Sequence, residues 1–154
     1  MDHRRIVTEA FEAWARGDGH VSRLFAEDMT WEIVGRSAAS GRYASASEFE
    51  AQVLEPFGRR FPPEAPFRPT RIREVIADGD TVAVLWDGAG TTVAGTRYEN
   101  TYAWILRLRD GKISSGLAFY DSIAFDELWH AVSPRAPEGG EQDSSIEPGQ
   151  QGAG

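Results

Sequence analysis

The chain has 154 residues, 24 acidic against 16 basic side chains, a formal net charge of −8 and no cysteine. This length suits one domain with a sizeable core. The acidic balance argues against partners such as nucleic acid or an anionic membrane surface, because both bind clustered Lys and Arg. Without cysteine, disulfides, thiolate nucleophiles and zinc–thiolate sites are excluded.

The first expected element is an amphipathic helix over residues 3–16, because apolar residues recur there at helical spacing and Gly17 suits a left-handed C-cap. The basic residues at the start are not followed by a continuous apolar run, and no stretch approaches the roughly 20 apolar residues of a membrane span. We therefore expect a cytoplasmic protein. A short second helix around residues 21–25 and a strand over residues 29–34 should follow.

Residues 35–41 are expected to form a loop before a third helix. Ser47 and Glu50 have the spacing of a capping box, and the helix that they open would carry Phe49, Val53, Leu54 and Phe57 on one side. Pro56 should kink or end this helix, because proline lacks the backbone N–H. The proline-rich residues 61–69 then predict an extended linker.

The second half of the chain is expected to consist of strands. Residues 71–77 and 81–86 flank Asp78-Gly79-Asp80, which predicts a hairpin. Residues 88–95 are rich in Gly, Thr and Ala and are expected to form a loop. No internal repeat is visible.

Residues 98–121 predict a long, bent antiparallel hairpin. Tyr98, Asn100, Tyr102 and Trp104 alternate with more polar residues, which is typical of a strand with one buried face, and Asp110-Gly111 supplies the positive φ angles of a tight turn. These four side chains combine apolar area with hydrogen-bonding tips, a mixture that suits the wall of a pocket.

The chain should end in a short helix over residues 125–132, with Asp121 as a cap, and a tail. Residues 134–154 contain no aromatic residue, eight Gly or Pro, and four acids against one Arg, which is typical of disorder. The predicted organisation is an α+β domain over residues 1–133 and a disordered tail over residues 134–154. We expect a strongly curved antiparallel sheet that forms a cone, with the N-terminal helices on its concave face and a cavity between them.

The order of these elements, with the segments FAEDMTWEIVG, DGDTVAVLW, YENTYAWILRLRDGKI and FYD, resembles the SnoaL-like branch of the nuclear-transport-factor-2-like superfamily. The resemblance covers about residues 4–132 and implies a cystatin-like α+β roll. The superfamily includes polyketide cyclases, limonene epoxide hydrolases and ketosteroid isomerases, and the resemblance further implies a homodimer. The fold alone does not decide the chemistry.

The resemblance transfers few catalytic residues. The acid or base of the cyclases and epoxide hydrolases falls on Ala118, and their Arg-x-Asp pair falls on Leu85 and Asp87, so that one carboxylate is matched. The Tyr and Asn of the epoxide hydrolases fall on Trp31 and Ile33.

The ketosteroid isomerase residues are matched even less. The isomerases' base falls on Ile33 or Glu32, depending on the alignment, and their two oxyanion donors fall on Ala10 and Trp104. Trp104 could donate an indole N–H but cannot act as an acid.

Asp87, Asn100 and Tyr102 are the catalytic candidates. Asp87 would act as acid or base in the wall of the pocket, or it is only a turn residue before Gly88. Asn100 and Tyr102 share a face and could orient a carbonyl, hydroxyl or epoxide oxygen, or they are core residues with satisfied polar atoms. Glu32 is interpreted as a solvated strand residue.

The remaining candidates are apolar or aromatic and would line the pocket around a substrate: Trp31, Ile33, Tyr98, Trp104, Ala118 and Tyr120. Gly116 and Ala118 are small residues on the same face as Tyr120, which indicates either space in the cavity or a closely packed helix.

No metal or cofactor is expected. His3, His20 and His130 do not have ligand spacing, and the glycines lack the strand-turn-helix context of a nucleotide site. The sequence therefore favours a cofactor-independent enzyme that acts on a small apolar carbonyl or epoxide compound. Two alternatives stay open: a non-catalytic binding module for an apolar metabolite, or a pure dimerisation domain.

Overall fold

Six strands form one curved sheet in the computed structural model, which describes residues 1–137; the order is β2-β1-β6-β5-β4-β3. The strands are β1 Phe25–Ile33, β2 Gly41–Tyr43, β3 Arg68–Asp78, β4 Thr81–Thr91, β5 Arg97–Arg109 and β6 Lys112–Tyr120. Neighbouring strands are antiparallel except β1 and β6, which are parallel. A parallel neighbour is possible there because helices and four other strands separate β1 from β6 along the chain.

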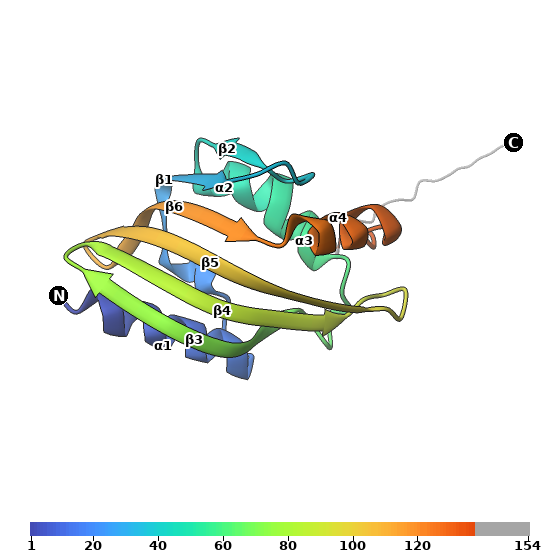
Figure 1. Cartoon of the computed structure of the whole chain (residues 1–154), viewed down its shortest axis with the longest axis horizontal. Coiled ribbons are helices and arrows are strands. Elements are labelled where there is room, and N and C mark those ends of the chain that lie inside the picture. The colour runs from blue at the N-terminus through green and yellow to red at the C-terminus, as the bar shows by residue number, and fades with distance from the viewer. Residues whose placement is uncertain (138–154) are drawn as a thin grey trace, which may run out of the picture.

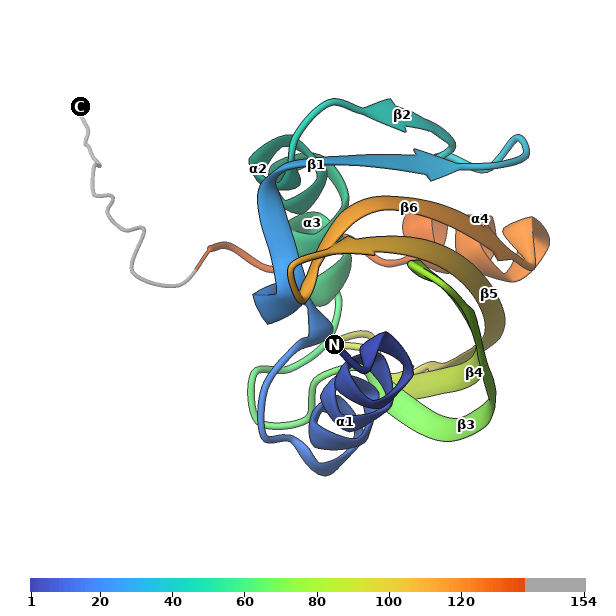
Figure 2. The same ribbon diagram turned by 90° about the vertical axis from the view of Figure 1, so that its left-hand side faces the viewer.

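The sheet curls around the helices (Figures 1 and 2). The helical segments are α1 His3–Arg16, a 3₁₀ turn at Val21–Leu24, α2 Ala46–Phe49, a π-helical turn at Glu50–Leu54, α3 Glu55–Gly58 and α4 Ser122–Ala131. Helix α1 packs against β3 and β4, while α2 lies against β1. The expected α+β roll with N-terminal helices on the concave face of the sheet is confirmed.

The hairpin between β5 and β6 forms as the sequence predicts. Asp110 and Gly111 both have positive φ, at 53° and 78°. Every second residue of β5 from Tyr98 to Leu108 is buried, and the residues between them are exposed or half-buried. The face with Tyr98, Asn100, Tyr102 and Trp104 is therefore the concave, core-facing side of the sheet.

Several predicted boundaries were wrong. Strand β4 continues to Thr91, so that the first half of the expected loop over residues 88–95 is strand. Glycine occurs at position 88 of this paired strand because a Cβ there would collide with the ring of Phe67. The short second helix is a single 3₁₀ turn, and β1 already begins at Phe25. Part of the expected linker over residues 61–69 is the start of β3.

Both helix caps lie close to where they were expected, but only one has the predicted residue. Ser45, and not Ser47, caps α2: its hydroxyl accepts from Glu48 N at 3.1 Å, while the Glu48 carboxylate accepts from Ala44 N at 2.7 Å. Asp121 caps α4 by accepting from Ile123 N and Ala124 N, as predicted. Because of this cap α4 begins at Ser122, three residues before the expected start.

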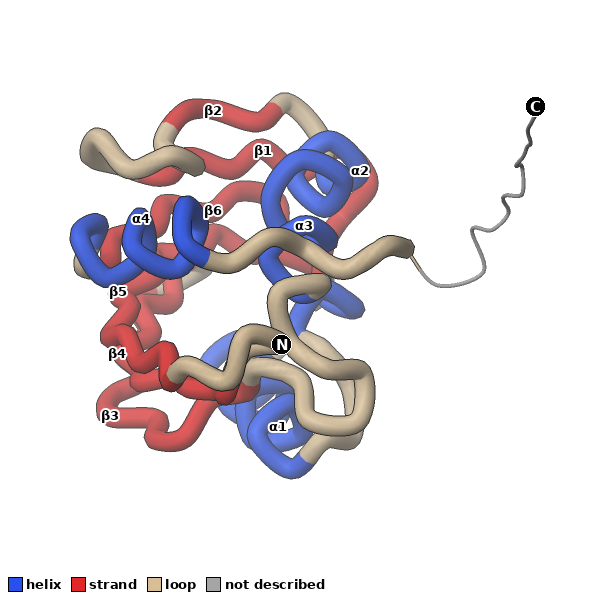
Figure 3. The backbone as a smooth tube through the Cα atoms, turned by 90° about the vertical axis from the view of Figure 1, so that its right-hand side faces the viewer, coloured by secondary structure: helices blue, strands red, loops and turns tan. Residues whose placement is uncertain are grey.

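The chain continues past α4 to contact the domain again (Figure 3). The backbone N–H of Arg135 donates to Arg59 O at 2.8 Å, and the Arg135 side chain donates to Phe61 O at 2.9 Å. The predicted disorder of the tail falls, from residue 138 onward, outside the described residues. Within residues 1–137 no helix is both long and apolar enough to cross a membrane.

Candidate functional site

The concave face of the sheet and the helices that cover it enclose an aromatic cavity of about 60 Å³. Its wall from the sheet is built by cross-strand neighbours: Trp86 pairs with Tyr102, which pairs with Tyr120, and Trp104 pairs with Ala118, which pairs with Ile33. Rings supply most of the lining, from Trp14, His20, Trp31, Phe49, Phe57, Phe67, Trp86, Tyr102, Trp104, Tyr120 and Phe125. The remaining lining residues are aliphatic: Ile33, Val53, Leu54 and Ala118.

Six of the residues predicted for the site meet in this cavity: Trp31, Ile33, Tyr102, Trp104, Ala118 and Tyr120. Two others, Tyr98 and Asn100, lie on the same face of β5 but do not line it. The space above Gly116 is not part of the cavity, because the ring of Trp31 fills it: a Cβ on Gly116 would collide with that ring. A neighbouring strand, rather than a helix, fills the gap.

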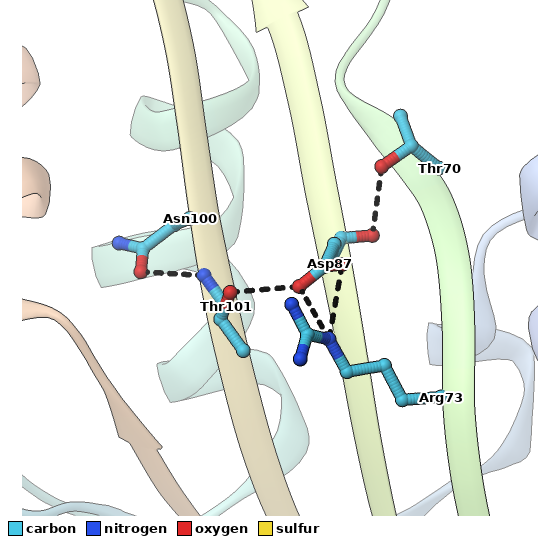
Figure 4. A network of polar contacts seen from close by, with 5 residues as sticks. All are labelled: Thr70, Arg73, Asp87, Asn100 and Thr101. Carbon is cyan, nitrogen blue, oxygen red and sulfur yellow. Dashed lines mark hydrogen bonds and ion pairs between the residues drawn. The ribbon is translucent and has the colours of Figure 1, made fainter.

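Asp87 lies on the opposite, outer face of the sheet, in the same row of alternate residues as the exposed Leu85. Its carboxylate accepts from Thr101 Oγ1 at 2.7 Å and from Arg73 Nε at 3.1 Å, and its carbonyl accepts from Thr70 (Figure 4). The hydrogen bond from Thr101, together with Arg73, lowers the pKa of Asp87. The structure thus does not bring Asp87 together with Tyr102.

Asn100 has every polar atom of its side chain engaged within the protein. Its Oδ1 accepts from Thr101 N at 2.8 Å and from Asp121 N at 3.1 Å, and two backbone donors at one atom fix the orientation of the amide. Its Nδ2 donates to Asp121 O at 3.0 Å and to Tyr98 Oη at 2.8 Å. Asn100 therefore has no free group for a ligand and instead organises its neighbours.

The hydroxyl groups of Tyr98 and Tyr102 continue this chain. Their oxygens are 2.7 Å apart, and Tyr98 already accepts from Asn100. If Tyr98 donates to Tyr102, the hydroxyl proton of Tyr98 is engaged in a hydrogen bond and that of Tyr102 has no acceptor. Tyr102 lines the cavity, whereas Tyr98 does not. Burial raises the pKa of Tyr98 to about 12 and the pKa of Tyr102 well above its usual range, so both phenols stay protonated at neutral pH.

The Tyr120 hydroxyl takes part in a second hydrogen-bond chain, with Ser37 Oγ at 2.8 Å, Ser40 Oγ 3.0 Å from Ser37 Oγ, and Val34 O 3.3 Å from Ser40 Oγ. If Ser40 donates to the Val34 carbonyl, Ser37 donates to Ser40 and Tyr120 donates to Ser37. Tyr120 would then have only lone pairs for a ligand.

His20 is a cavity residue that the sequence analysis missed. Its ring packs on Trp14 with the centroids 4.3 Å apart, and its Nδ1 accepts from Ser22 N at 3.0 Å. Burial lowers the pKa of His20 to about 4, so the ring is neutral at pH 7 with its proton on Nε2. No periodic pattern marks His20; only the reversal of the chain at Gly17 and Gly19, both with positive φ, carries it back onto α1.

The cavity contains no carboxylate among the lining residues, and no cluster of potential metal ligands occurs in residues 1–137. Two buried indole N–H groups, of Trp31 and Trp86, lack an acceptor among the described residues. These two nitrogens are inaccessible, so the polar groups that the lining residues offer a ligand are those of Tyr102, Tyr120 and His20.

Comparisons with known proteins agree with this architecture. A Burkholderia thailandensis NTF2-like protein has 23% identity and a TM-score of 0.64, covering 82% of this chain and 95% of its own. A Xanthomonas campestris protein with a cystatin-like fold has 22% identity and a TM-score of 0.67, covering 84% of this chain and 98% of its own. At these identities the likeness shows the fold alone.

A further structural neighbour, TerC, was crystallised together with polyporic acid; it has 19% identity and a TM-score of 0.61, and the match covers 83% of this chain and 98% of TerC. None of the curated proteins matches the sequence. The family model of the SnoaL-like domain matches residues 7–116, which is well over half of the chain. The protein belongs to the SnoaL-like domain family.

Proposed function

We propose that the protein binds a small apolar molecule with a carbonyl-type oxygen in the aromatic cavity, with the Tyr102 hydroxyl as the donor to that oxygen. The proposal rests on the place of Tyr102 in the hydrogen-bond chain that starts at Asn100: when Tyr98 donates to Tyr102, the Tyr102 hydroxyl keeps a proton for a ligand. Tyr102 is buried and lines a cavity whose walls are otherwise aromatic or aliphatic. A buried donor without a partner costs about 1–3 kcal/mol, which a carbonyl oxygen would recover.

The size of the cavity limits the ligand. A volume of about 60 Å³ holds only a few heavy atoms, whereas drug-sized ligands occupy roughly 300–1,000 Å³. Leu54 and Phe57, which are only partly buried, lie in and just after the π-helical turn and line the cavity. Single π-helical turns are frequent at functional sites. A ligand of ring size requires these two side chains to move aside.

The proposed test is an NMR titration with cyclohexanone, which combines a compact apolar ring with one carbonyl. Wild-type protein should show shifts at the indole signals of the cavity tryptophans. Tyr102→Phe should weaken the affinity about fivefold, since one hydrogen bond is worth about 1 kcal/mol and 1.4 kcal/mol corresponds to a tenfold change. The matched control is Tyr43→Phe, whose hydroxyl donates to Ala39 O outside the cavity. Equal effects of the two substitutions would contradict the role of Tyr102.

An enzymatic role is the second candidate, because a hydrogen bond from Tyr102 to a carbonyl oxygen would also stabilise an enolate. The lack of a carboxylate in the cavity lining argues for binding without turnover, since proton abstraction needs a base. The two functions differ in deuterium exchange at the carbons beside the carbonyl of bound cyclohexanone. Exchange that depends on Tyr102 would favour the isomerase or cyclase type, and exchange at the uncatalysed rate would favour the binding module.

A further inference from the structure

His20 offers a second donor to the cavity, in a wall other than that of Tyr102. The residue lies between α1 and the 3₁₀ turn, whereas Tyr102 lies on β5. The rings between them are Trp14, which packs on His20, and Trp86, which packs on Trp14 with centroids 5.1 Å apart and stacks on Tyr102 at 4.2 Å. Two aromatic rings therefore separate the two donors.

The tautomer of His20 is fixed by the backbone. Because Nδ1 accepts from Ser22 N, the neutral ring has its proton on Nε2, and one face of the ring is covered by Trp14. No residue in the described range 1–137 accepts a hydrogen bond from Nε2. The Nε2 N–H thus has no partner among these residues, and it belongs to a half-buried side chain that lines the cavity.

The balance of donors and acceptors gives the class of ligand. Two lining residues carry a hydrogen-bond donor for a ligand, Tyr102 and His20. A ligand with a single oxygen would leave one of these two donors unpaired. Stacked aromatic walls favour a flat ring.

We infer that His20 is a specificity-determining residue, and that the ligand is an uncharged ring compound with carbonyl oxygens on two different edges, one for Tyr102 and one for His20. This inference rests on the proposed binding of a carbonyl compound in the same cavity. It assigns His20 a contact with the ligand that adds to the one proposed for Tyr102.

The test compares two probes of nearly equal size, cyclohexanone with one carbonyl and 1,4-cyclohexanedione with two, by NMR titration at pH 7.5. The dione should bind wild-type protein about fivefold more tightly than the monoketone, because it gains one hydrogen bond of about 1 kcal/mol. His20→Asn should abolish this preference and leave the affinity for the monoketone within about twofold. Asparagine is a suitable substitute because its short side chain can still accept from Ser22 N as a cap.

A second variant, His20→Phe, keeps a ring against Trp14 and lacks both nitrogens, so it should lose the preference as well. If the wild-type protein binds both probes and Tyr102→Phe weakens both, but His20→Asn and His20→Phe still prefer the dione, the inference about His20 is wrong and the proposed function stands. If neither probe binds wild-type protein, the proposed function fails and the inference fails with it.

Discussion

At the scale of single residues, Asn100 shows how one buried polar side chain can organise the wall of a cavity. The amide makes hydrogen bonds to the backbone N–H and C=O of Asp121, the residue that follows β6 and caps α4, and it also donates to the Tyr98 hydroxyl. Buried polar groups are retained where all their hydrogen bonds are made, and here all four are. The polarity of Tyr102 is therefore set two residues away, by a side chain that does not line the cavity.

Asn100→Ala should lower the free energy of unfolding by about 3 kcal/mol, because the part-buried hydrogen bonds to the backbone N–H and C=O of Asp121 and the buried one to Tyr98 would be lost. Urea denaturation of the purified variant measures this change. The control is Thr101→Val, which removes a hydroxyl from the outer face and should cost about 1 kcal/mol or less. A loss for Asn100→Ala as small as that of the control would contradict the structural role of the amide.

His20 should make stability depend on pH. Its pKa is about 4 in the folded protein against 6.5 for the ordinary group, so between these values the unfolded chain binds more protons than the folded one. Stability is then fully present above pH 6.5 and falls as the pH is lowered towards 4, by a total on the order of 3 kcal/mol.

The measurement that isolates His20 is urea denaturation of wild-type protein and His20→Asn at pH 7 and at pH 4.5. Carboxylates titrate in both proteins, so their contribution cancels in the comparison. The wild-type protein should lose more stability than the variant between the two pH values. Identical losses would show that His20 keeps an ordinary pKa in the folded state.

At the scale of secondary-structure elements, the parallel pair of β1 and β6 determines which residues border the cavity. The register places Trp31 of β1 beside Gly116 of β6 and Ile33 beside Ala118. The large ring occupies the space that the missing side chain leaves, and it stacks on Phe49 of α2 at 4.7 Å. A large–small pair between neighbouring strands thus couples the sheet to the helix above it.

Gly116→Ala should displace Trp31, because its new methyl group would occupy the position of the ring. Such overpacking costs about 1–3 kcal/mol and should also change the ligand affinity, since Trp31 lines the cavity. Thermal unfolding and the indole signal of Trp31 check both effects. Ala103→Gly on the outer face of β5 is the matched control, which should affect stability but leave the Trp31 signal in place.

At the scale of the whole molecule, the sequence predicted those parts that periodicity determines. Alternation along β5 placed Tyr102 and Trp104 in the wall, because a strand presents every second residue to the core. Alternation along β4 could not predict which face of the sheet carries Asp87, because Leu85 and Trp86 lie on opposite faces and are both apolar. In the structure Leu85 is exposed, so Asp87 lies with it on the outer face. The cap of α2 was misplaced because Ser45 and Ser47 each have a Glu three residues later.

His20 escaped prediction for a different reason. Its contact with Trp14 depends on the turn of the chain at Gly17 and Gly19. The types and spacing of the residues predict a turn there, but not which residues it brings into contact. The sequence therefore predicts the strand residues that line the cavity, but it does not predict that His20 lines it as well.

The outer face of the sheet is the remaining large surface, and its centre is apolar. The pairing places Ala103 between Leu85 and Phe119, and Ile105 between Ala83 and Leu117. Leu85, Ile105 and Phe119 are 37%, 40% and 41% exposed, although arginines and acids surround them. Contiguous apolar side chains inside a charged rim are typical of protein interfaces. We propose that two copies pair through this face, as a two-fold symmetric contact in which each patch covers the other.

Light scattering after size exclusion at micromolar concentration should give twice the chain mass of 17.0 kDa. Ile105→Glu should reduce the mass to that of a monomer, because a carboxylate at the centre of the patch would be buried without a partner. Ile123→Glu is the control: Ile123 is 72% exposed but lies on α4, away from the sheet face, so this variant should remain a dimer. A wild-type monomer, or a dimer that survives Ile105→Glu, would remove the outer face as the interface. Because Asp87 lies on that same face and the cavity on the other, dimer formation should leave the affinity for cyclohexanone unchanged.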